Sequence, residues 1–323
     1  MKMNKNRVDP ELMAALEFIE EATGGEFRLD DIPAARQALY KFYEITRKQI
    51  PDIEGVTTEI RKIPGPQGEP HVEVRIFQPE NRAEVLPALL WIHGGGYVMG
   101  SAEQDELQTQ YFAKTLQCVV VSVDYRLAPE TPYPGPLEDC YASLKWLYNN
   151  CSELGVDQSR IAIGGASAGG GLTAGLALLV RDRGEMNIIY QLLIFPMIDD
   201  KNIHPPSADY PDTFIWSRGN NLTGWRSYLG QEPGGDKVPF YAAPFRAADV
   251  SGLPPAYVMV GGLDLFLDEN IEYAQRLMSA GIPTELHVIP GVYHGFYGNA
   301  PQATVSKQFT AERDAILKRV LHG

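Results

Sequence analysis

The sequence predicts an α/β fold, in which helices cover both faces of a mostly parallel sheet. Two observations support this class. Short, largely apolar runs rich in β-branched and aliphatic residues are typical of strands that are buried on both faces. Each run is followed by a turn and then mostly by a helical pattern, as in parallel sheets with crossover helices. The runs lie at 88–92, 118–123, 160–163, 188–195, 256–260 and 285–289.

The segments before these runs predict helices and then antiparallel strands. Asp9 is a residue type that caps helices and Pro10 suits the first helical position, so we expect a helix to begin here. A second helical pattern covers 33–48. From 57 to 77, apolar and polar residues alternate on either side of a turn rich in Pro and Gly at 64–68, which predicts antiparallel strands.

The regular alternation of strand and helix is interrupted once, between residues 196 and 241. This stretch is polar, rich in Pro and Gly, contains several aromatic residues and has no strand pattern. An insertion of this length in a compact domain is usually functional, for example a lid over an active site. We therefore expect this segment to cover a site.

Charge and composition exclude several classes of protein. The chain has 323 residues, 44% hydrophobic and 21% charged, and 28 Lys and Arg against 41 Asp and Glu give a net charge of −13. Nucleic acid is not an expected partner, because its binding depends on clustered basic residues. No membrane span is expected either, because no apolar stretch approaches the roughly 20 residues that one needs.

The three cysteines, Cys118, Cys140 and Cys151, are not spaced as metal ligands. An odd number of cysteines in a chain of this size favours buried thiols in a reducing compartment over a disulfide framework. The N-terminal segment lacks the uninterrupted apolar core of a signal peptide and contains acidic residues. We therefore expect a cytoplasmic protein with no metal.

A Gly-x-Ser-x-Gly pattern centred on Ser167 lies between the predicted strand 160–163 and a helical pattern at 170–183. In this context the pattern presents a nucleophilic serine, because flanking glycines leave its hydroxyl projecting and the next amide free. The alternative is a turn whose glycines only allow close packing of helix on sheet. A phosphate-binding loop is excluded, since Gly170 stands where Lys is required, and a dinucleotide pattern from Gly169 begins too far beyond the strand.

The sequence His-Gly-Gly-Gly at 93–96 directly follows the predicted strand 88–92 and precedes Ser167. Glycine amides can approach a developing negative charge without interference from side chains, as in the oxyanion holes of acyl transfer. The alternative is that the three glycines form an ordinary loop. His93 is interpreted as a residue that holds this loop and not as a base.

A general base and an orienting acid are expected to follow the serine in the chain. Three histidines do so. His287 belongs to a predicted strand, and His322 is next to the C-terminus, where we expect the chain to fray. His294 lies in a glycine-flanked loop after the last predicted strand and is the candidate base.

Asp264 and Asp268 compete for the role of the acid. Asp268 precedes a helical pattern and is explained as its N-cap. Asp264 lies in the loop after the predicted strand 256–260, at the sheet edge where ligand sites gather. Asp264 is therefore the favoured candidate.

Together these segments resemble the hormone-sensitive-lipase-like family of α/β hydrolases, the bacterial carboxylesterases with an HGGG motif. The likeness also includes the Asp-Tyr-Arg-Leu-Ala-Pro-Glu sequence at 124–130 and His-Gly-Phe at 294–296. The resemblance implies an α/β-hydrolase fold with an eight-stranded sheet and a helical cap. It divides the chain into an N-terminal cap segment at 1–53 and a catalytic domain at 54–323, with a cap insertion at about 197–240. It also implies oxyanion donors at the amides of Gly95, Gly96 and Ala168.

Two positions depart from the family pattern. Ala166 stands where the family usually carries Asp, Glu or Thr before the serine, and Leu265 replaces the proline of an Asp-Pro-Leu sequence. Both departures bear on the shape of the acyl pocket. The aromatic residues of the cap, together with the resemblance, suggest a closed apolar pocket with Tyr97, Phe214, Trp216 and Leu265 as candidate substrate contacts.

We therefore expect a cofactor-free serine esterase that hydrolyses short- to medium-chain carboxylic esters through Ser167, His294 and Asp264. An amidase or formamidase with the same triad is an alternative, because triad chemistry does not separate esters from amides. A non-catalytic receptor is a second alternative, since plant gibberellin receptors resemble the same family but lack the triad histidine, which is present here. The expected partner is a small-molecule ester, and homo-oligomerisation stays open.

Overall fold

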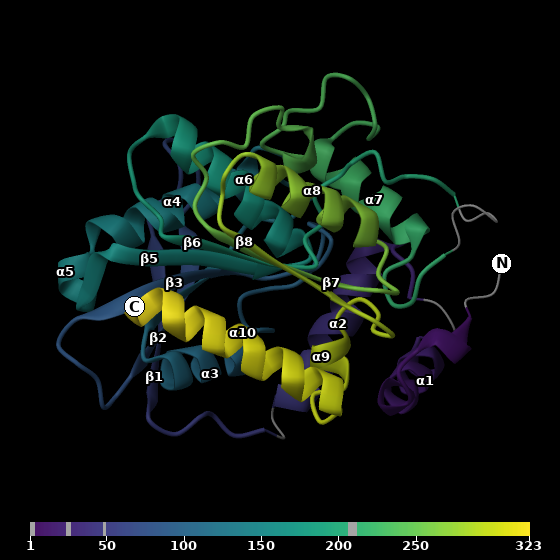
Figure 1. Cartoon of the computed structure of the whole chain (residues 1–323), viewed down its shortest axis with the longest axis horizontal. Helices are drawn as coiled ribbons and strands as arrows, with labels where there is room; N and C mark the ends of the chain where they lie inside the picture. The colour runs from purple at the N-terminus through teal and green to yellow at the C-terminus, as the bar shows by residue number, and fades with distance from the viewer. Residues whose placement is uncertain (1–3, 24–26, 48–49, 206–211) are drawn as a thin grey trace.

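The computed structural model describes residues 4–23, 27–47, 50–205 and 212–323. Lys48, at the end of the second predicted helix, and residues 206–211 of the expected cap insertion lie outside the described residues. Figure 1 shows the whole chain as a central twisted sheet with helices on both faces.

The described strands form one eight-stranded sheet in the order β1-β2-β4-β3-β5-β6-β7-β8. β2 pairs antiparallel with β1 and with β4, and all other pairs are parallel. This confirms the predicted fold class. The strands are β1 (Val56–Ile63), β2 (Val72–Pro79), β3 (Leu86–Ile92), β4 (Val119–Asp124), β5 (Val156–Ala166), β6 (Tyr190–Ile194), β7 (Ala256–Gly261) and β8 (Thr284–Ile289).

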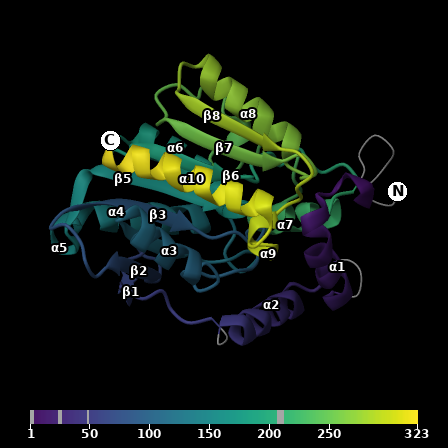
Figure 2. The ribbon, with the colours of Figure 1, turned by 60° about the horizontal axis from the view of Figure 1, so that its bottom comes forward.

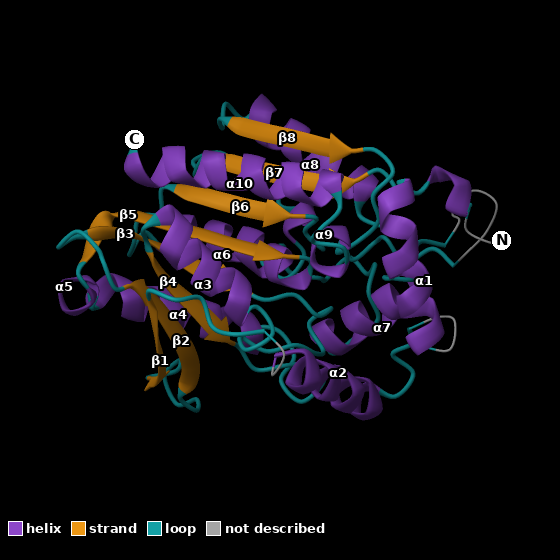
Figure 3. Cartoon of the chain, turned by 90° about the horizontal axis from the view of Figure 1, so that it is seen from below, coloured by secondary structure: helices purple, strands orange, loops and turns teal. Residues whose placement is uncertain are grey.

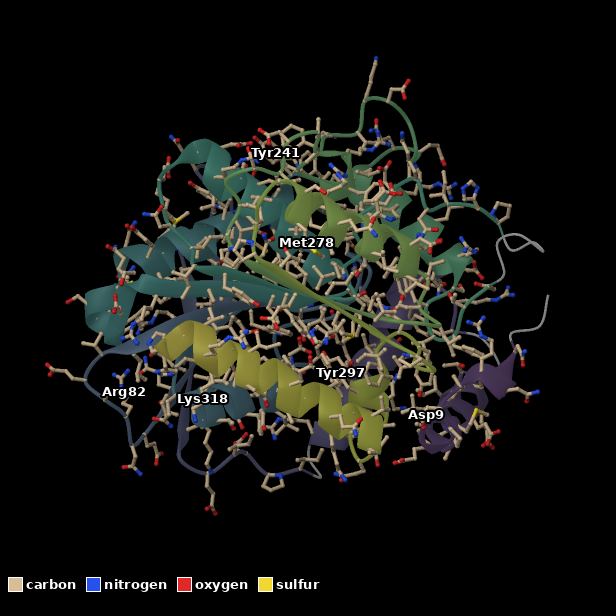
Figure 4. All side chains as sticks on the ribbon, in the orientation of Figure 1. Asp9, Arg82, Tyr241, Met278, Tyr297 and Lys318 are labelled. Atoms are coloured by element: carbon tan, nitrogen blue, oxygen red, sulfur yellow. The ribbon has the colours of Figure 1, made fainter. Side chains whose placement is uncertain are left out.

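Helices cover both faces of this sheet (Figures 1 and 2). On one face lie α4 (Gly135–Asn149), α6 (Ala168–Arg183) and α8 (Leu267–Ser279), and on the other lie α3 (Glu106–Leu116) and α10 (Thr304–His322). The central strands β3 and β4 are almost fully buried, because both of their faces are covered. Figure 4, in which Tyr297 is labelled, shows the side chains that fill the space between α10 and the sheet.

A third group of helices gathers at the carboxyl end of the parallel strands, as Figure 3 shows. It contains α1 (Met13–Ala22) and α2 (Ile32–Arg47) from the N-terminal segment and α7 (Arg218–Leu229) from the insertion. The remaining helical elements are short: α5 (Cys151–Leu154), α9 (Phe296–Asn299) and the 3₁₀ turns Lys5–Arg7, Pro10–Leu12 and Pro244–Arg246. The N-terminal segment and the insertion, far apart in sequence, therefore meet over the carboxyl ends of the parallel strands, where ligand sites form in such folds.

Several local predictions can be compared with the structure. The Asp9 side chain accepts a hydrogen bond from the backbone N–H of Glu11, so it caps a 3₁₀ turn that leads into α1. The three cysteines are buried and free, as expected. The expectation that His322 frays is wrong, because α10 continues to this residue and its Nε2 lies 2.6 Å from the carbonyl oxygen of Leu116. No helix within the described ranges combines the length and the apolar character that crossing a bilayer requires.

Candidate active site

Ser167 lies in the sharp turn between β5 and α6, with φ 57° and ψ −122°. A positive φ is unfavourable for a residue with a side chain, so the surrounding contacts must hold this conformation. Its N–H donates to the carbonyl of Ile194 at 2.9 Å, and its carbonyl accepts from the N–H groups of Gly171 (2.9 Å) and Met197 (3.0 Å). The strained turn is therefore fixed by hydrogen bonds to β6, to α6 and to the segment that follows β6.

The glycines on either side of Ser167 are required by close backbone contacts. A Cβ atom on Gly165 would lie 2.5 Å from the carbonyl of Gly169, and one on Gly169 would overlap the carbonyl oxygen of Ile92. Backbone atoms cannot move aside as a flexible side chain can. The glycines thus allow helix and strand to approach closely, and the same approach directs the Ser167 side chain away from the turn.

Ser167, His294 and Asp264 form a continuous hydrogen-bonded chain. The Nε2 atom of His294 lies 2.9 Å from the Oγ of Ser167, and its Nδ1 lies 2.8 Å from the Oδ2 of Asp264. Because a carboxylate only accepts hydrogen bonds, Nδ1 carries a proton and Nε2 is left to accept one from the Ser167 hydroxyl. All three residues are buried, with 5–7% of their surface exposed.

Two aromatic rings and one backbone amide fix the orientation of this chain. The rings of Phe195 and Phe266 lie 4.5 Å and 5.2 Å from the His294 ring, between centroids. The Oδ1 atom of Asp264 accepts a hydrogen bond from the N–H of Phe266 at 3.0 Å. Neither phenylalanine was singled out from the sequence, although Phe195 ends the predicted strand 188–195 and Phe266 lies two residues after Asp264.

Asp268 does not take part in this arrangement. It is exposed in the first turn of α8, and the N-cap position belongs to Phe266, so the prediction of Asp268 as the N-cap is wrong. The helix begins earlier than its apolar pattern indicated, and the acid at this position faces solvent near the positive end of the helix dipole.

The glycine loop at 94–96 lies directly against the serine turn. A Cβ atom on Gly94 would lie 3.3 Å from the Cβ of Ser167. Gly95 and Gly96 have φ values of 124° and 60°, which favour glycine. Among the described residues, none accepts a hydrogen bond from the backbone amides of Gly95, Gly96 or Ala168. These amides are therefore available to a negatively charged oxygen.

His93 supports this loop from behind. It is fully buried, its Nδ1 lies 2.7 Å from the carbonyl of Gly94, and its ring stacks on Tyr125 with 4.2 Å between centroids. Burial lowers the pKa of His93, which favours the neutral imidazole. These contacts agree with the interpretation of His93 as a residue that holds the loop.

The four candidate substrate contacts lie in different environments. The ring of Trp216 packs so closely on Gly96 that a Cβ atom there would overlap it. Phe214 packs near Tyr293, 6.4 Å between ring centroids, and the carbonyl of Leu265 accepts from the Asn202 amide at 3.0 Å. The Tyr97 side chain, in contrast, is fully buried, stacks on Tyr228 and donates its hydroxyl proton to the carbonyl of Met197, so it supports the core behind the loop.

Sequence reasoning also missed Glu269, a buried acid near the site. Its carboxylate accepts hydrogen bonds from the N–H groups of Ile198 and Asp199 and from the amide of Asn202. Burial raises the pKa of Glu269 well above its usual value. Nothing in the sequence marks this residue, because glutamates are mostly exposed in folded proteins.

The arrangement as a whole is suited to acyl transfer. A serine hydroxyl, a histidine that can accept its proton and a buried carboxylate that orients the histidine lie beside three free backbone amides. Such a constellation is recognised by its geometry, in any fold.

Comparisons with known proteins give a consistent result. A family described as "alpha/beta hydrolase fold" matches residues 89–298. Esterase LipI of Mycobacterium tuberculosis is 35% identical over 326 residues, which covers 99% of this chain and 97% of the relative. Ethyl acetate hydrolase of Pseudomonas putida is 30% identical over 69% of this chain and 70% of its own length. A solved structure titled "Bacterial Heroin Esterase" superimposes with a TM-score of 0.92 at 40% identity, covering 99% of this chain and 100% of the other.

Proposed function

The chain belongs to the hormone-sensitive-lipase-like family of α/β hydrolases and is a carboxylic ester hydrolase, and we propose that it acts through Ser167, His294 and Asp264 on short- to medium-chain esters. The observation that carries this proposal is the hydrogen-bonded chain, with 2.9 Å from Ser167 Oγ to His294 Nε2 and 2.8 Å from His294 Nδ1 to Asp264 Oδ2. The intact histidine argues against a receptor that binds a ligand without hydrolysing it.

The proposed reaction has two halves. First, the Oγ of Ser167 attacks the ester carbonyl carbon while its proton passes to Nε2 of His294. The tetrahedral intermediate collapses, the bond to the alcohol oxygen breaks, and His294 returns the proton to the leaving alcohol. Water then attacks the acyl carbon while one of its protons passes to Nε2 of His294. His294 gives that proton to the Oγ of Ser167 as the acyl bond to Ser167 breaks, and the carboxylic acid leaves with the other proton of the water. Asp264 stabilises the imidazolium that forms in each half.

We assign the oxyanion hole to the amides of Gly95, Gly96 and Ala168. Negative charge develops on the carbonyl oxygen when Ser167 attacks, and preorganised donors stabilise it without reorganisation. Removing one such donor costs about 2.7–4 kcal/mol of transition-state stabilisation in serine hydrolases. The proximity of Gly94 to the Ser167 side chain supports this role for the two residues that follow it.

The proposed preference for short to medium acyl chains is supported by the packing around the serine. Trp216 lies against Gly96, and the rings of Phe195 and Phe266 flank His294, so bulky aromatic side chains lie close to the proposed reacting groups. The name of one relative, ethyl acetate hydrolase, also refers to an ester with a two-carbon acyl group. We propose that Trp216, Phe214 and Leu265 contact the substrate and that Tyr97 acts through the packing behind the loop. A rate profile over p-nitrophenyl esters tests this, and a maximum at twelve carbons or longer would refute it.

We further propose that residues 1–53 and about 197–240 form a cap on a catalytic domain at 54–323. The gathering of α1, α2 and α7 over one edge of the sheet supports this division (Figure 3). Three buried, free thiols support a reducing, cytoplasmic location. Proteolysis that releases α7 and leaves a folded sheet domain with an exposed Ser167 would support the division.

The amidase alternative differs only in the leaving group that His294 protonates. Parallel assays on matched aryl esters and anilides separate the two activities, and we expect the ester to be strongly preferred. The role of Ser167 itself is tested by Ser167→Ala: a folded variant that hydrolyses p-nitrophenyl butyrate as fast as the wild type would overturn the assignment.

A further inference from the structure

Arg36 connects the N-terminal helix α2 to the glycine loop. Its Nε donates to the carbonyl of Val98 at 2.5 Å, and its Nη2 donates to the carbonyl of Ala128 at 2.6 Å. The guanidinium also forms a two-pronged pair with Glu130, at 2.9 Å and 2.8 Å. Only 16% of the Arg36 side chain is exposed, whereas the Glu130 side chain is 61% exposed. One side chain of α2 therefore contacts two backbone carbonyls beside the proposed oxyanion hole.

These carbonyls belong to a small network that shapes the loop. The N–H groups of Val98 and Met99 both donate to the carbonyl of Gly95, at 3.1 Å and 3.0 Å. The N–H of Ala128 donates to the carbonyl of Tyr97 at 3.0 Å. The Gly95 carbonyl and the Gly96 amide share one peptide plane, so the bonds that fix this carbonyl also fix the direction of the amide. Arg36 donates to the carbonyls of both Val98 and Ala128, and so connects these two backbone segments of the network.

The loop needs such support, because its own backbone is permissive. Gly95, Gly96 and Tyr97 in succession have positive φ values. Glycine adopts many conformations at similar energy, and a non-glycine residue with positive φ is held there by its surroundings. Contacts to the Val98 and Ala128 carbonyls restrict the alternatives that the glycines would otherwise allow.

We propose that Arg36 is a positioning residue that orients the oxyanion amides of Gly95 and Gly96, so that the N-terminal helix contributes to the rate of the chemical step. This inference rests on the proposed function, because it concerns the donors that would stabilise the transition state. Arginine is suited to the role, since its planar fork directs several N–H groups at once. Lysine carries one ammonium group and cannot meet Val98, Ala128 and Glu130 with the same geometry.

The proposal predicts a loss in kcat and little change in KM for Arg36→Ala. A displacement of about 1 Å in a positioned group costs up to about 10²-fold in rate, so a loss of about 10- to 100-fold is expected. Binding of an alkyl trifluoromethyl ketone, which forms a tetrahedral adduct with the serine, should weaken by the same factor as kcat/KM. A general loss of structure would not give this proportionality at unchanged KM.

Two variants serve as controls. Arg61→Ala removes an arginine of the edge strand β1 that pairs with Glu59 and with Glu153 of α5, and kcat should not change; the Arg61 side chain is 29% exposed, against 16% for Arg36. Glu130→Ala removes the exposed partner and leaves both backbone contacts of Arg36. The kcat should therefore fall by less than about fivefold, which is the factor that corresponds to the free energy of an exposed ion pair.

The experiment measures kcat, KM, inhibitor affinity and Tm for Arg36→Ala, Arg36→Lys and the two controls. If Arg36→Ala does not fold, Arg36→Lys carries the test, with a proportional loss of kcat/KM and inhibitor affinity expected. The proposal would be overturned if folded Arg36 variants had wild-type kcat, whether KM was unchanged or raised. Ser167→Ala measured alongside distinguishes failure of the proposed function from failure of the role of Arg36. Activity in Ser167→Ala refutes the proposed function, whereas an inactive Ser167→Ala together with wild-type kcat in the Arg36 variants refutes only the role of Arg36.

Discussion

Replacing Asp264 with asparagine should inactivate the enzyme without changing the volume of the side chain. The Oδ1 atom accepts a hydrogen bond from the N–H of Phe266, which can only donate, so the single oxygen of asparagine must stay at this position. The amide NH₂ then replaces Oδ2, 2.8 Å from Nδ1 of His294. Because NH₂ donates, Nδ1 must become the acceptor and the ring proton moves to Nε2. The nitrogen that faces Ser167 can then no longer accept its proton.

The size of this effect follows from the tautomer. The equivalent change in a serine protease triad lowers kcat by about 10⁴-fold with its geometry intact. At 1.36 kcal/mol for each factor of ten, this loss corresponds to about 5.4 kcal/mol of activation free energy. We expect a decrease of this order for Asp264→Asn, measured as kcat on p-nitrophenyl butyrate at neutral pH, with Tm recorded to show that the variant folds.

Asp268→Asn is the matched control, since it makes the same chemical change four positions along the same segment. Asp268 is exposed, so we expect wild-type kcat and at most a loss of about 0.3–1 kcal/mol in unfolding free energy from the weaker helix-dipole interaction. The assignment of Asp264 as the acid is refuted if Asp264→Asn keeps more than about a tenth of the wild-type kcat, or if Asp268→Asn is the variant that loses it.

Three further predictions concern the first turn of α6, the expected cap and the ion pair between Arg36 and Glu130. Gly169→Ala places a methyl group against a backbone carbonyl and should lower the unfolding free energy by about 1–3 kcal/mol or more, whereas Gly298→Ala meets open space; urea unfolding compares the two. Trp216→Ala should raise kcat/KM for eight-carbon relative to two-carbon esters, and an unchanged ratio would exclude Trp216 from the acyl pocket. The hydrogen bond from Arg36 lowers the pKa of Glu130 in the folded protein. The stability that this bond contributes is therefore fully present above the pKa of Glu130 in the unfolded chain, about 4.3, and is lost as the pH falls through its lower pKa in the folded protein. Unfolding curves of wild type and Glu130→Gln should therefore converge at acidic pH, and a constant difference would contradict this.

Much of the fold could be predicted because buried parallel strands leave a local signal. The run at 256–260 corresponds to β7 at Ala256–Gly261, since both faces of this strand are covered and its apolar residues are continuous. β5, in contrast, begins at Val156, earlier than the predicted start at 160. After Val156, residues 157–160 are polar and partly or fully exposed, and hydrophobic pattern alone does not distinguish them from a loop.

The proposed catalytic residues were found because each lies in a short motif at the end of a strand. The Ser167 turn carries its own steric requirements in the flanking glycines, and His294 lies in a loop with glycine on either side. Arg36 and Glu269 left no such signal. Arg36 contacts Val98, 62 positions away in the sequence, and Glu269 contacts Ile198, 71 positions away. Contacts between residues so far apart leave no periodic pattern in the sequence.

The most direct test of the account is to trap the acyl-enzyme step. Diethyl p-nitrophenyl phosphate transfers its phosphoryl group to an activated serine, and intact-mass and peptide mass spectrometry identify the modified residue. We predict one diethylphosphoryl group per chain, located on Ser167, with loss of esterase activity in proportion to labelling and no labelling of Ser167→Ala. Labelling at another residue, or full esterase activity in a chain labelled at Ser167, would contradict the central claim.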